Sequence, residues 1–191
     1  MTYVENKDMG NLRIVAFAGS LRKESYNKKI LEIIAEKVAG YDVEIKILDL
    51  NDYEIPLFNQ DIEDEGMPLK TKEFKKEIHN ANAILIASPE YNGSFSGVLK
   101  NVIDWVSRKL NPNESMYEAF AKKPVGLVAA SPGGLGGIRG IIQLRGVMFD
   151  LKAAVMPEYA SISEAYNIDE TKIAKLEAFG GNYIEFCKKL I

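Results

Sequence analysis

Apolar segments of strand length alternate with amphipathic segments along the chain. A continuous apolar run is typical of a strand buried on both faces of a sheet, and apolar residues three or four positions apart indicate a helix with one buried side. The pattern therefore predicts five strands, each followed by a helix. The expected strands span residues 13–18, 43–50, 83–88, 124–131 and 153–156, and the expected helices span about 28–39, 69–80, 98–106, 138–150 and 169–190.

Three parts of this pattern are less regular. Residues 51–68 contain two prolines and the acidic run DIEDEG, which predicts a long surface loop. Residues 69–80 are strongly charged, so their helix is expected on the surface. Trp105 lies among five apolar residues that already supply the buried side of its helix. It fits either the core or a dimer contact, and we favour the contact.

The alternation of strands and helices predicts a parallel sheet with helices on both faces. Five strands with chemically rich loops after the first, third and fourth favour an α/β flavodoxin-like three-layer sandwich with strand order 2-1-3-4-5. We expect a single domain over residues 1–191, with residues 1–11 as a polar N-terminal extension. In such a sheet a ligand binds at the carboxyl ends of the strands, near the switch point between strands one and three.

Composition and charge narrow the function classes. The net charge of -3 argues against a nucleic-acid-binding protein, and no run approaches the roughly 18 apolar residues of a membrane span. One cysteine, Cys187, and one histidine, His79, rule out a disulfide framework within the chain and make a Cys/His metal cluster an unexpected feature. We expect His79 to be structural or merely solvated, and Cys187 to be packed or partly exposed. We expect the protein in a reducing, cytoplasmic setting.

The segment GSLRKESYN, residues 19–27, joins the first strand to a helix and carries many hydrogen-bond donors. Free N–H groups and the helix dipole favour an anion at that position. Ser20 and Ser25 add hydroxyls, Asn27 adds an amide, and Arg22 adds a planar cation that suits phosphate. Capping of the helix by Ser25 or Asn27 is the alternative, but it leaves Ser20 and Arg22 unexplained.

Two familiar phosphate motifs are missing from the chain. It has no Gly-Lys dipeptide, so it has no Walker A loop, and no G-x-G-x-x-G follows the first strand. The segment SPGGLGG, residues 131–137, also departs from that spacing, because Arg139 stands where the third glycine belongs. The first loop is therefore expected to hold a monophosphate.

The segment PEYNGSFSG, residues 89–97, follows the third strand. Tyr91 can lay its ring against a flat ligand, and the backbone N–H groups of residues 90–93 can face the polar edge of an isoalloxazine. Neutral donors there stabilise the negative charge of a reduced flavin. A plain turn between strand and helix is the alternative for this segment, and a flexible glycine connector is the alternative for residues 131–137.

With these motifs in place, the chain resembles the NADPH-dependent FMN reductase family from about Leu12 to Ile191. The first loop resembles the family's G-S-x-R-x-x-S-x-N phosphate loop, and PEYN with the helix after it resembles a second family segment. The resemblance implies non-covalent FMN, NADPH or NADH as electron donor, a small-molecule acceptor, and a homodimer or dimer of dimers. It implies FMN contacts at Ser20, Arg22, Ser25, Tyr26, Asn27, Pro89, Glu90, Tyr91, Asn92, Gly93, Ser131, Gly133 and Gly134.

The resemblance also implies the chemistry. Hydride would pass from the nicotinamide to the flavin and then to a quinone, azo, nitro, chromate or flavin acceptor, with no protein residue as acid, base or nucleophile. Two other classes stay open. One is a flavodoxin-type electron carrier without nicotinamide activity, which Arg22 and the modest net charge disfavour. The other is a regulatory or scaffold protein that keeps FMN for stability.

Overall fold

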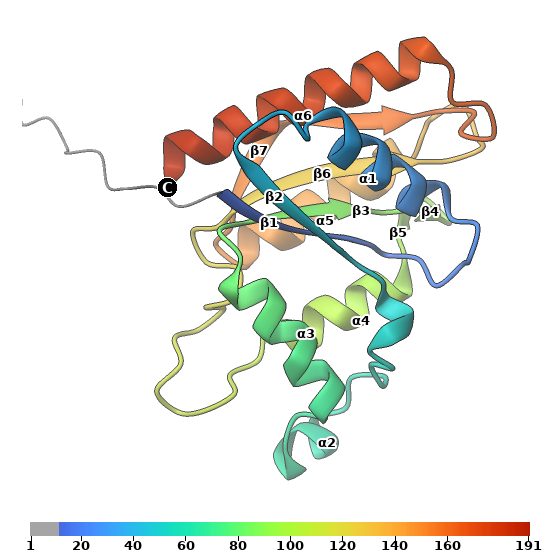
Figure 1. The fold of residues 1–191 in the computed structure, drawn as a ribbon. Helices are drawn as coiled ribbons and strands as arrows, with labels where there is room; N and C mark the ends of the chain where they lie inside the picture. Colours follow the sequence, from blue (N-terminus) through green and yellow to red (C-terminus); the bar gives the residue numbers. More distant parts are fainter. Residues whose placement is uncertain (1–11) are drawn as a thin grey trace, which may run out of the picture.

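A parallel five-stranded sheet forms the centre of the computed structural model, which describes residues 12–191. Every neighbouring pair of strands is parallel, and the spatial order is β2-β1-β3-β6-β7 (Figure 1). In chain order these are the first to fifth strands, so the expected order 2-1-3-4-5 is confirmed. The strands are β1 (Leu12–Ala18), β2 (Val43–Leu48), β3 (Ala83–Ala87), β6 (Pro124–Ala130) and β7 (Ala154–Ile162).

Helices cover both faces of the sheet, which gives the three expected layers (Figure 1). Helices α1 and α6 pack on one face, while α3, α4 and α5 pack on the other. The long helices are α1 (Tyr26–Lys37), α3 (Leu69–Asn80), α4 (Gly97–Val106), α5 (Ile138–Asp150) and α6 (Glu170–Leu190).

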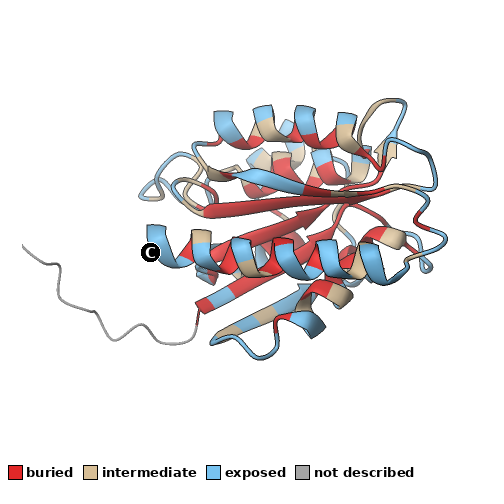
Figure 2. Cartoon of the chain, turned by 90° about the horizontal axis from the view of Figure 1, so that it is seen from above, coloured by how far each residue is buried: buried red, intermediate tan, exposed pale blue. Residues whose placement is uncertain are grey.

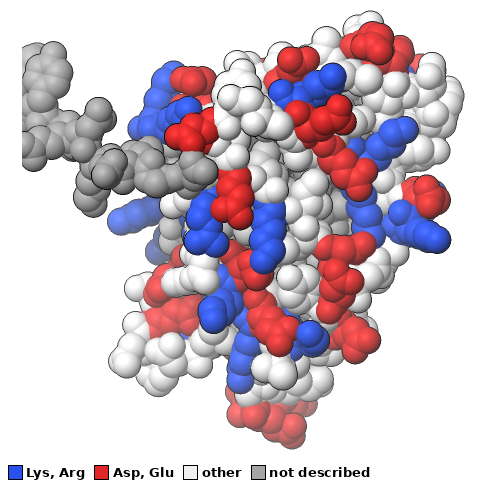
Figure 3. Space-filling model, viewed as in Figure 1, with Lys and Arg blue, Asp and Glu red and all other residues white. Residues whose placement is uncertain are grey.

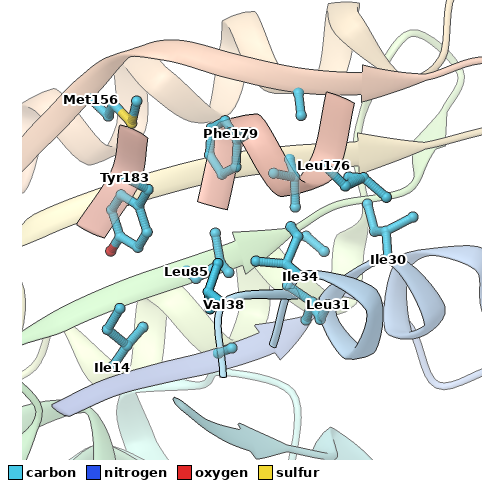
Figure 4. Close-up of a cluster of buried hydrophobic side chains, with 14 of the residues drawn as sticks. Ile14, Ile30, Leu31, Ile34, Val38, Leu85, Met156, Leu176, Phe179 and Tyr183 are labelled. Carbon is cyan, nitrogen blue, oxygen red and sulfur yellow. The ribbon is translucent and has the colours of Figure 1, made fainter. Parts of the chain in front are cut away.

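The central strands are buried almost completely, as expected for a sheet covered on both faces (Figure 2). On the face of α1 and α6, side chains such as Ile34 and Phe179 meet the sheet around Leu85 (Figure 4). Tyr183 of α6 is also buried there, and its hydroxyl donates to the carbonyls of Ile84 (2.6 Å) and Pro124 (3.2 Å). These hydrogen bonds satisfy the Tyr183 hydroxyl, which would otherwise be buried without a polar partner.

The interval 51–68 is more ordered than the expected surface loop. It contains the end of a 3-10 turn, η1 (Leu50–Asp52), and a short helix, α2 (Gln60–Glu65). The Asn59 side chain caps α2 by accepting a hydrogen bond from the N–H of Asp61 at 2.9 Å. Helix α2 has no buried residue, so it lacks the apolar periodicity from which a helix is predicted.

The expected dimer contact at Trp105 is wrong for this residue, which is fully buried within the chain. Its indole Nε1 donates to the carbonyl of Pro56 at 2.8 Å, and its ring meets that of Phe58 edge to face. The segment around Pro56 folds over α4 and covers the side of the helix that the sheet leaves open. The sequence did not place that segment on α4, because 49 residues separate the two partners.

Strand β7 is longer than the expected strand 153–156. Its pairing with β6 shifts between Val125, which faces Val155, and Leu127, which faces Tyr159. The irregularity holds Pro157, which cannot donate to a ladder and is tolerated on an edge strand or at a bulge. The strand therefore continues beyond the proline to Ile162.

Two surface observations concern the described residues as a whole. Lys and Arg are interspersed with Asp and Glu on the face shown in Figure 3, without a large area of one sign. Within residues 12–191, no helix is both long enough and apolar enough to span a bilayer.

Candidate functional site

Three loops meet at the carboxyl ends of β1, β3 and β6, on the right-hand side of Figure 1. Between them lies a shallow cavity of about 50 Å³. Nine of the thirteen predicted cofactor residues line it: Ser20, Arg22, Ser25, Tyr26, Asn27, Pro89, Glu90, Tyr91 and Ser131. Three larger hollows lie elsewhere on the surface of residues 12–191, and none of the three joins the donors of all three loops.

The loop between β1 and α1 presents two buried hydroxyls to this cavity. Ser25 caps α1, and its Oγ accepts from the N–H of Lys28 at 3.4 Å. Ser20 Oγ accepts from the N–H of Arg22 at 3.3 Å. Each serine accepts in these bonds, so its hydroxyl proton stays available for an anion. The first turn of α1 carries no acidic residue, which leaves the positive end of the helix uncompensated.

Arg22 lies at the exposed rim of the cavity. Its guanidinium carbon is 5.9 Å from the centroid of the Tyr26 ring, within the range of a cation–π contact. Within residues 12–191, no carboxylate forms an ion pair with Arg22. The charge of Arg22 is therefore held beside the two serines without an acidic partner among the described residues.

Asn27 has a structural role that the sequence did not indicate. Its Nδ2 donates to the carbonyl of Ala130, and its Oδ1 accepts from the N–H of the same residue, both at 2.9 Å. This pair of bonds fastens the first turn of α1 to the end of β6. One Nδ2 hydrogen remains for a ligand, and the phosphate contact of Asn27 stays a prediction.

The segment after β3 is a small hairpin, which the sequence analysis did not expect. Strands β4 (Glu90–Tyr91) and β5 (Ser94–Phe95) pair through a two-residue turn, Asn92–Gly93. Both turn residues have positive φ, 52° and 76°, as a type I′ turn requires. Tyr91 is half exposed beside this turn and lines the cavity, so its ring is available to a flat ligand.

The Glu90 carboxylate is directed toward α5. It accepts from the N–H groups of Arg139 at 3.0 Å and Gly140 at 3.4 Å, and it forms an ion pair with the Arg139 guanidinium. Burial by itself would raise the pKa of Glu90, but the bonds from Arg139 and Gly140 outweigh it and lower that pKa. Glu90 therefore caps α5 as an anion, and only its backbone remains for the predicted contact with a ring.

The glycine segment lies beside the cavity, and the predicted cofactor contacts of Gly133 and Gly134 stay predictions. Gly133 and Gly134 are exposed and do not line the cavity. The N–H of Gly133 donates to Ser131 Oγ at 3.2 Å. The backbone needs glycine at Gly136 and Gly137, whose φ angles are 60° and 90°.

The donor set fits the phosphate end of FMN. Two buried hydroxyls, a helix N-terminus and a guanidinium converge on a cavity too small for a whole cofactor. A flat ring attached to that phosphate would lie outside the cavity, against the half-exposed Tyr91. Asn92 and Gly93 follow Tyr91 in the hairpin but do not line the cavity, so their contact with the ring stays a prediction.

The sequence did not predict two residues that line the cavity or one residue that binds the hairpin. Ala130 and Pro132 line the cavity but carry no side-chain donor that would have marked them. Gln143 binds the hairpin from the exposed side of α5. About 50 residues separate it from the hairpin, and its position in α5 is that of an ordinary surface residue.

Comparisons with known proteins identify the family of this chain. The family model for NADPH-dependent FMN reductase matches residues 12–167. The chain is 39% identical to a quinone reductase of Pseudomonas putida over 147 residues, which cover 76% of this chain and 75% of that protein. It is also 39% identical to an NAD(P)H:quinone oxidoreductase of Solanum tuberosum over 155 residues, covering 78% and 74%.

One solved flavoenzyme structure is similar to this chain over almost its whole length. The flavoenzyme NAD(P)H:(acceptor) oxidoreductase FerB from Paracoccus denitrificans superposes with a TM-score of 0.76 at 25% identity, covering 93% of this chain and 98% of that one. The match of the family model extends over most of the chain and includes all three loops of the cavity. The chain therefore belongs to the NADPH-dependent FMN reductase family.

Proposed function

We propose that this protein transfers electrons from NAD(P)H to quinones through bound FMN. Its family makes it an FMN-containing oxidoreductase with NAD(P)H as electron donor. The names of two relatives, quinone reductase and NAD(P)H:quinone oxidoreductase, support a quinone as acceptor. The observation that carries the proposal is the convergence of three loops, from three different strands, on one cavity with phosphate-binding chemistry.

The chain contributes binding and orientation. Ser20, Ser25 and Arg22 would hold the phosphate, and Tyr91 would pack against the ring. The N–H groups of the hairpin would stabilise the negative charge of the reduced ring. FMN supplies the redox chemistry when bound, because it accepts a hydride and returns electrons to a second substrate.

Turnover with purified protein tests this function. The protein, saturated with FMN, should oxidise NADPH or NADH when benzoquinone is added, and azo, nitro, chromate and free flavin acceptors should be compared on the same preparation. Protein that cannot be loaded with FMN, or that is loaded but leaves both nucleotides unoxidised with every acceptor, would contradict the proposal. The ratio of the two nucleotide rates gives the donor preference.

Anaerobic reduction of the bound flavin separates the proposed enzyme from a flavodoxin-type carrier. A carrier binds FMN but needs a partner reductase, so NADPH added anaerobically would leave its flavin oxidised. The proposed enzyme should bleach its flavin absorbance with NADPH or NADH alone. Bleaching without subsequent turnover would favour the third class, a protein that keeps FMN for stability.

The proposal includes a homodimer. Helices α4 and α5 border a surface groove of about 620 Å³, and beside it Ile142 and Phe149 of α5 are 60% and 80% exposed. Large apolar side chains exposed together support a protein partner, and a second copy is the one we propose. Analytical ultracentrifugation should give a dimer that Phe149→Glu converts to monomer. A monomeric wild-type protein would contradict this part.

We also place the protein in the cytoplasm. Its single cysteine, Cys187, is buried, and burial raises the pKa of its thiol to about 12, so it supports no disulfide and suits a reducing compartment. Fractionation of the source cells should recover the protein with cytoplasmic markers. Recovery with membranes or the exterior would contradict this placement.

A further inference from the structure

The hairpin that faces the proposed flavin ring is attached to α5 at its tip. Gln143 makes both attachments with one side chain. Its Nε2 donates to the carbonyl of Gly93 at 2.8 Å, and its Oε1 accepts from the hydroxyl of Ser94 at 2.7 Å. A single amide therefore holds the second turn residue and the residue after it.

The base of the hairpin has a second attachment to the same helix. The Glu90 carboxylate, 7% exposed, accepts from the N–H of Arg139 at 3.0 Å and from its guanidinium Nε at 2.7 Å. The backbones also lie close together: a Cβ on Gly140 would stand 3.2 Å from the nitrogen of Phe95. The hairpin thus rests on the start of α5 and is bonded to it at two levels.

We propose that Gln143 is a positioning residue, which aligns the Asn92–Gly93 tip so that its backbone N–H groups meet the edge of the FMN ring. Gln143 does not line the cavity and so acts through the hairpin. A type I′ turn in a two-stranded hairpin is only marginally stable alone, which is why an external anchor matters. This inference rests on the proposed function, because it concerns the ring of the same FMN.

The anchor has a consequence for the potential of the flavin. N–H donors at the edge of the ring stabilise the reduced form more than the oxidised form, because reduction places negative charge there. If the tip is released, the donors lose their alignment and the reduced form loses stabilisation. The midpoint potential of bound FMN then becomes more negative, even when every site is filled.

Gln143→Leu tests the inference, because leucine keeps much of the side-chain bulk but can neither donate to Gly93 nor accept from Ser94. Gln60→Leu is the matched control, since Gln60 is an exposed helical glutamine in α2 outside the proposed site. Ser94→Ala removes the hydroxyl bond at a half-buried position and serves if Gln143→Leu fails to fold. Three quantities are measured: amide hydrogen exchange of residues 90–95 in FMN-free protein, the Kd for FMN, and the midpoint potential at saturating FMN.

Gln143→Leu should increase exchange in residues 90–95, weaken FMN binding by about fivefold to tenfold, and shift the midpoint potential to a more negative value. Ser94→Ala should change all three in the same direction by a smaller amount, and Gln60→Leu should change none. An unchanged potential in Gln143→Leu and Ser94→Ala would overturn the positioning role even if the protein were less stable.

Failure of the inference and failure of the proposed function give different results. If wild-type protein binds FMN and reduces quinone while the variants match it in all three measurements, only the inference is wrong. If wild-type protein binds no FMN, the proposed function fails and the role of Gln143 toward FMN falls with it. Hydrogen exchange in the FMN-free variants then still reports whether Gln143 orders the hairpin.

Discussion

Two side chains at the start of α1 each form a structural hydrogen bond and can also bind a ligand. Ser25 caps the helix by accepting through its Oγ, and it lines the cavity with a hydroxyl that can still donate to a ligand. Asn27 must satisfy the backbone of Ala130, and it keeps one hydrogen for a ligand. Arg22 differs from them, because it forms no ion pair with a carboxylate among residues 12–191 and lies at the rim of the cavity. Arg22 is therefore the residue whose removal tests the phosphate site with least effect on the fold.

Arg22→Ala should weaken FMN binding by about tenfold to a hundredfold, because a phosphate loses a charged hydrogen-bond partner. Arg22→Lys should recover part of the loss, since it keeps the charge but not the planar fork. Fluorescence titration of FMN measures both. Arg13→Ala is the control, because Arg13 is an exposed arginine at the opposite end of β1. Equal affinity in Arg22→Ala and wild type would exclude the phosphate role.

The predicted residues that the structure brings to the cavity from the first loop share a local signal. Ser20, Arg22 and Ser25 follow a buried strand and precede a helix, so nine residues of sequence were enough to predict that they lie together. Their contact with a phosphate stays a prediction. The residues to which the Asn27 and Trp105 side chains are hydrogen-bonded lie 103 and 49 residues away in the sequence. Their roles depend on how distant segments pack, and a single sequence gives no indication of such pairs.

At the scale of elements, α3 shows how a charged helix can still bury a charge. Its bounds agree with the expected helix 69–80, yet Lys75 is only 2% exposed. Lys75 forms an ion pair with Glu114 and donates to the carbonyl of Arg108. Both partners belong to the long segment between α4 and β6, so one buried ammonium holds that segment to α3. Periodicity predicted the helix, but it could not identify which lysine would be covered.

Glu114→Ala should lower the free energy of unfolding by about 3 kcal/mol, because it leaves the Lys75 ammonium buried without its counter-charge. The double variant Lys75→Met, Glu114→Leu should lie within about 1 kcal/mol of wild type, since apolar side chains replace both charges. Urea denaturation of both variants measures the difference. A single variant as stable as wild type would show that the pair does not hold the segment.

For the whole molecule, acid should be the destabilising condition. The pKa values of Asp49, Glu90 and Glu114 are lowered in the folded protein, although burial opposes the shift in each case. The causes are hydrogen bonds and charges from Lys28, Arg139 and Lys75 respectively. A carboxyl whose pKa is lower in the folded than in the unfolded state stabilises the fold only while it is ionised.

The stabilisation from these three groups should be complete above the unfolded pKa values of 3.8 for Asp and 4.5 for Glu. It should be lost as the pH falls through the lower folded values. Urea denaturation between about pH 7 and about pH 3 should give a free energy of unfolding that decreases mainly below about pH 5. Glu114→Gln should reduce that decrease, because one of the titrating groups is gone. A free energy that stays constant down to about pH 3 would contradict the assignment.

The double hydrogen bond between Asn27 and Ala130 also bears on how the protein is made. Its two partners are 103 residues apart, so a ribosome must release the chain beyond β6 before the first turn of α1 can be fastened. A nascent chain that ends earlier carries the serines and Arg22 but lacks this attachment. We therefore expect cofactor loading to be a late event in synthesis, after about two thirds of the chain has emerged.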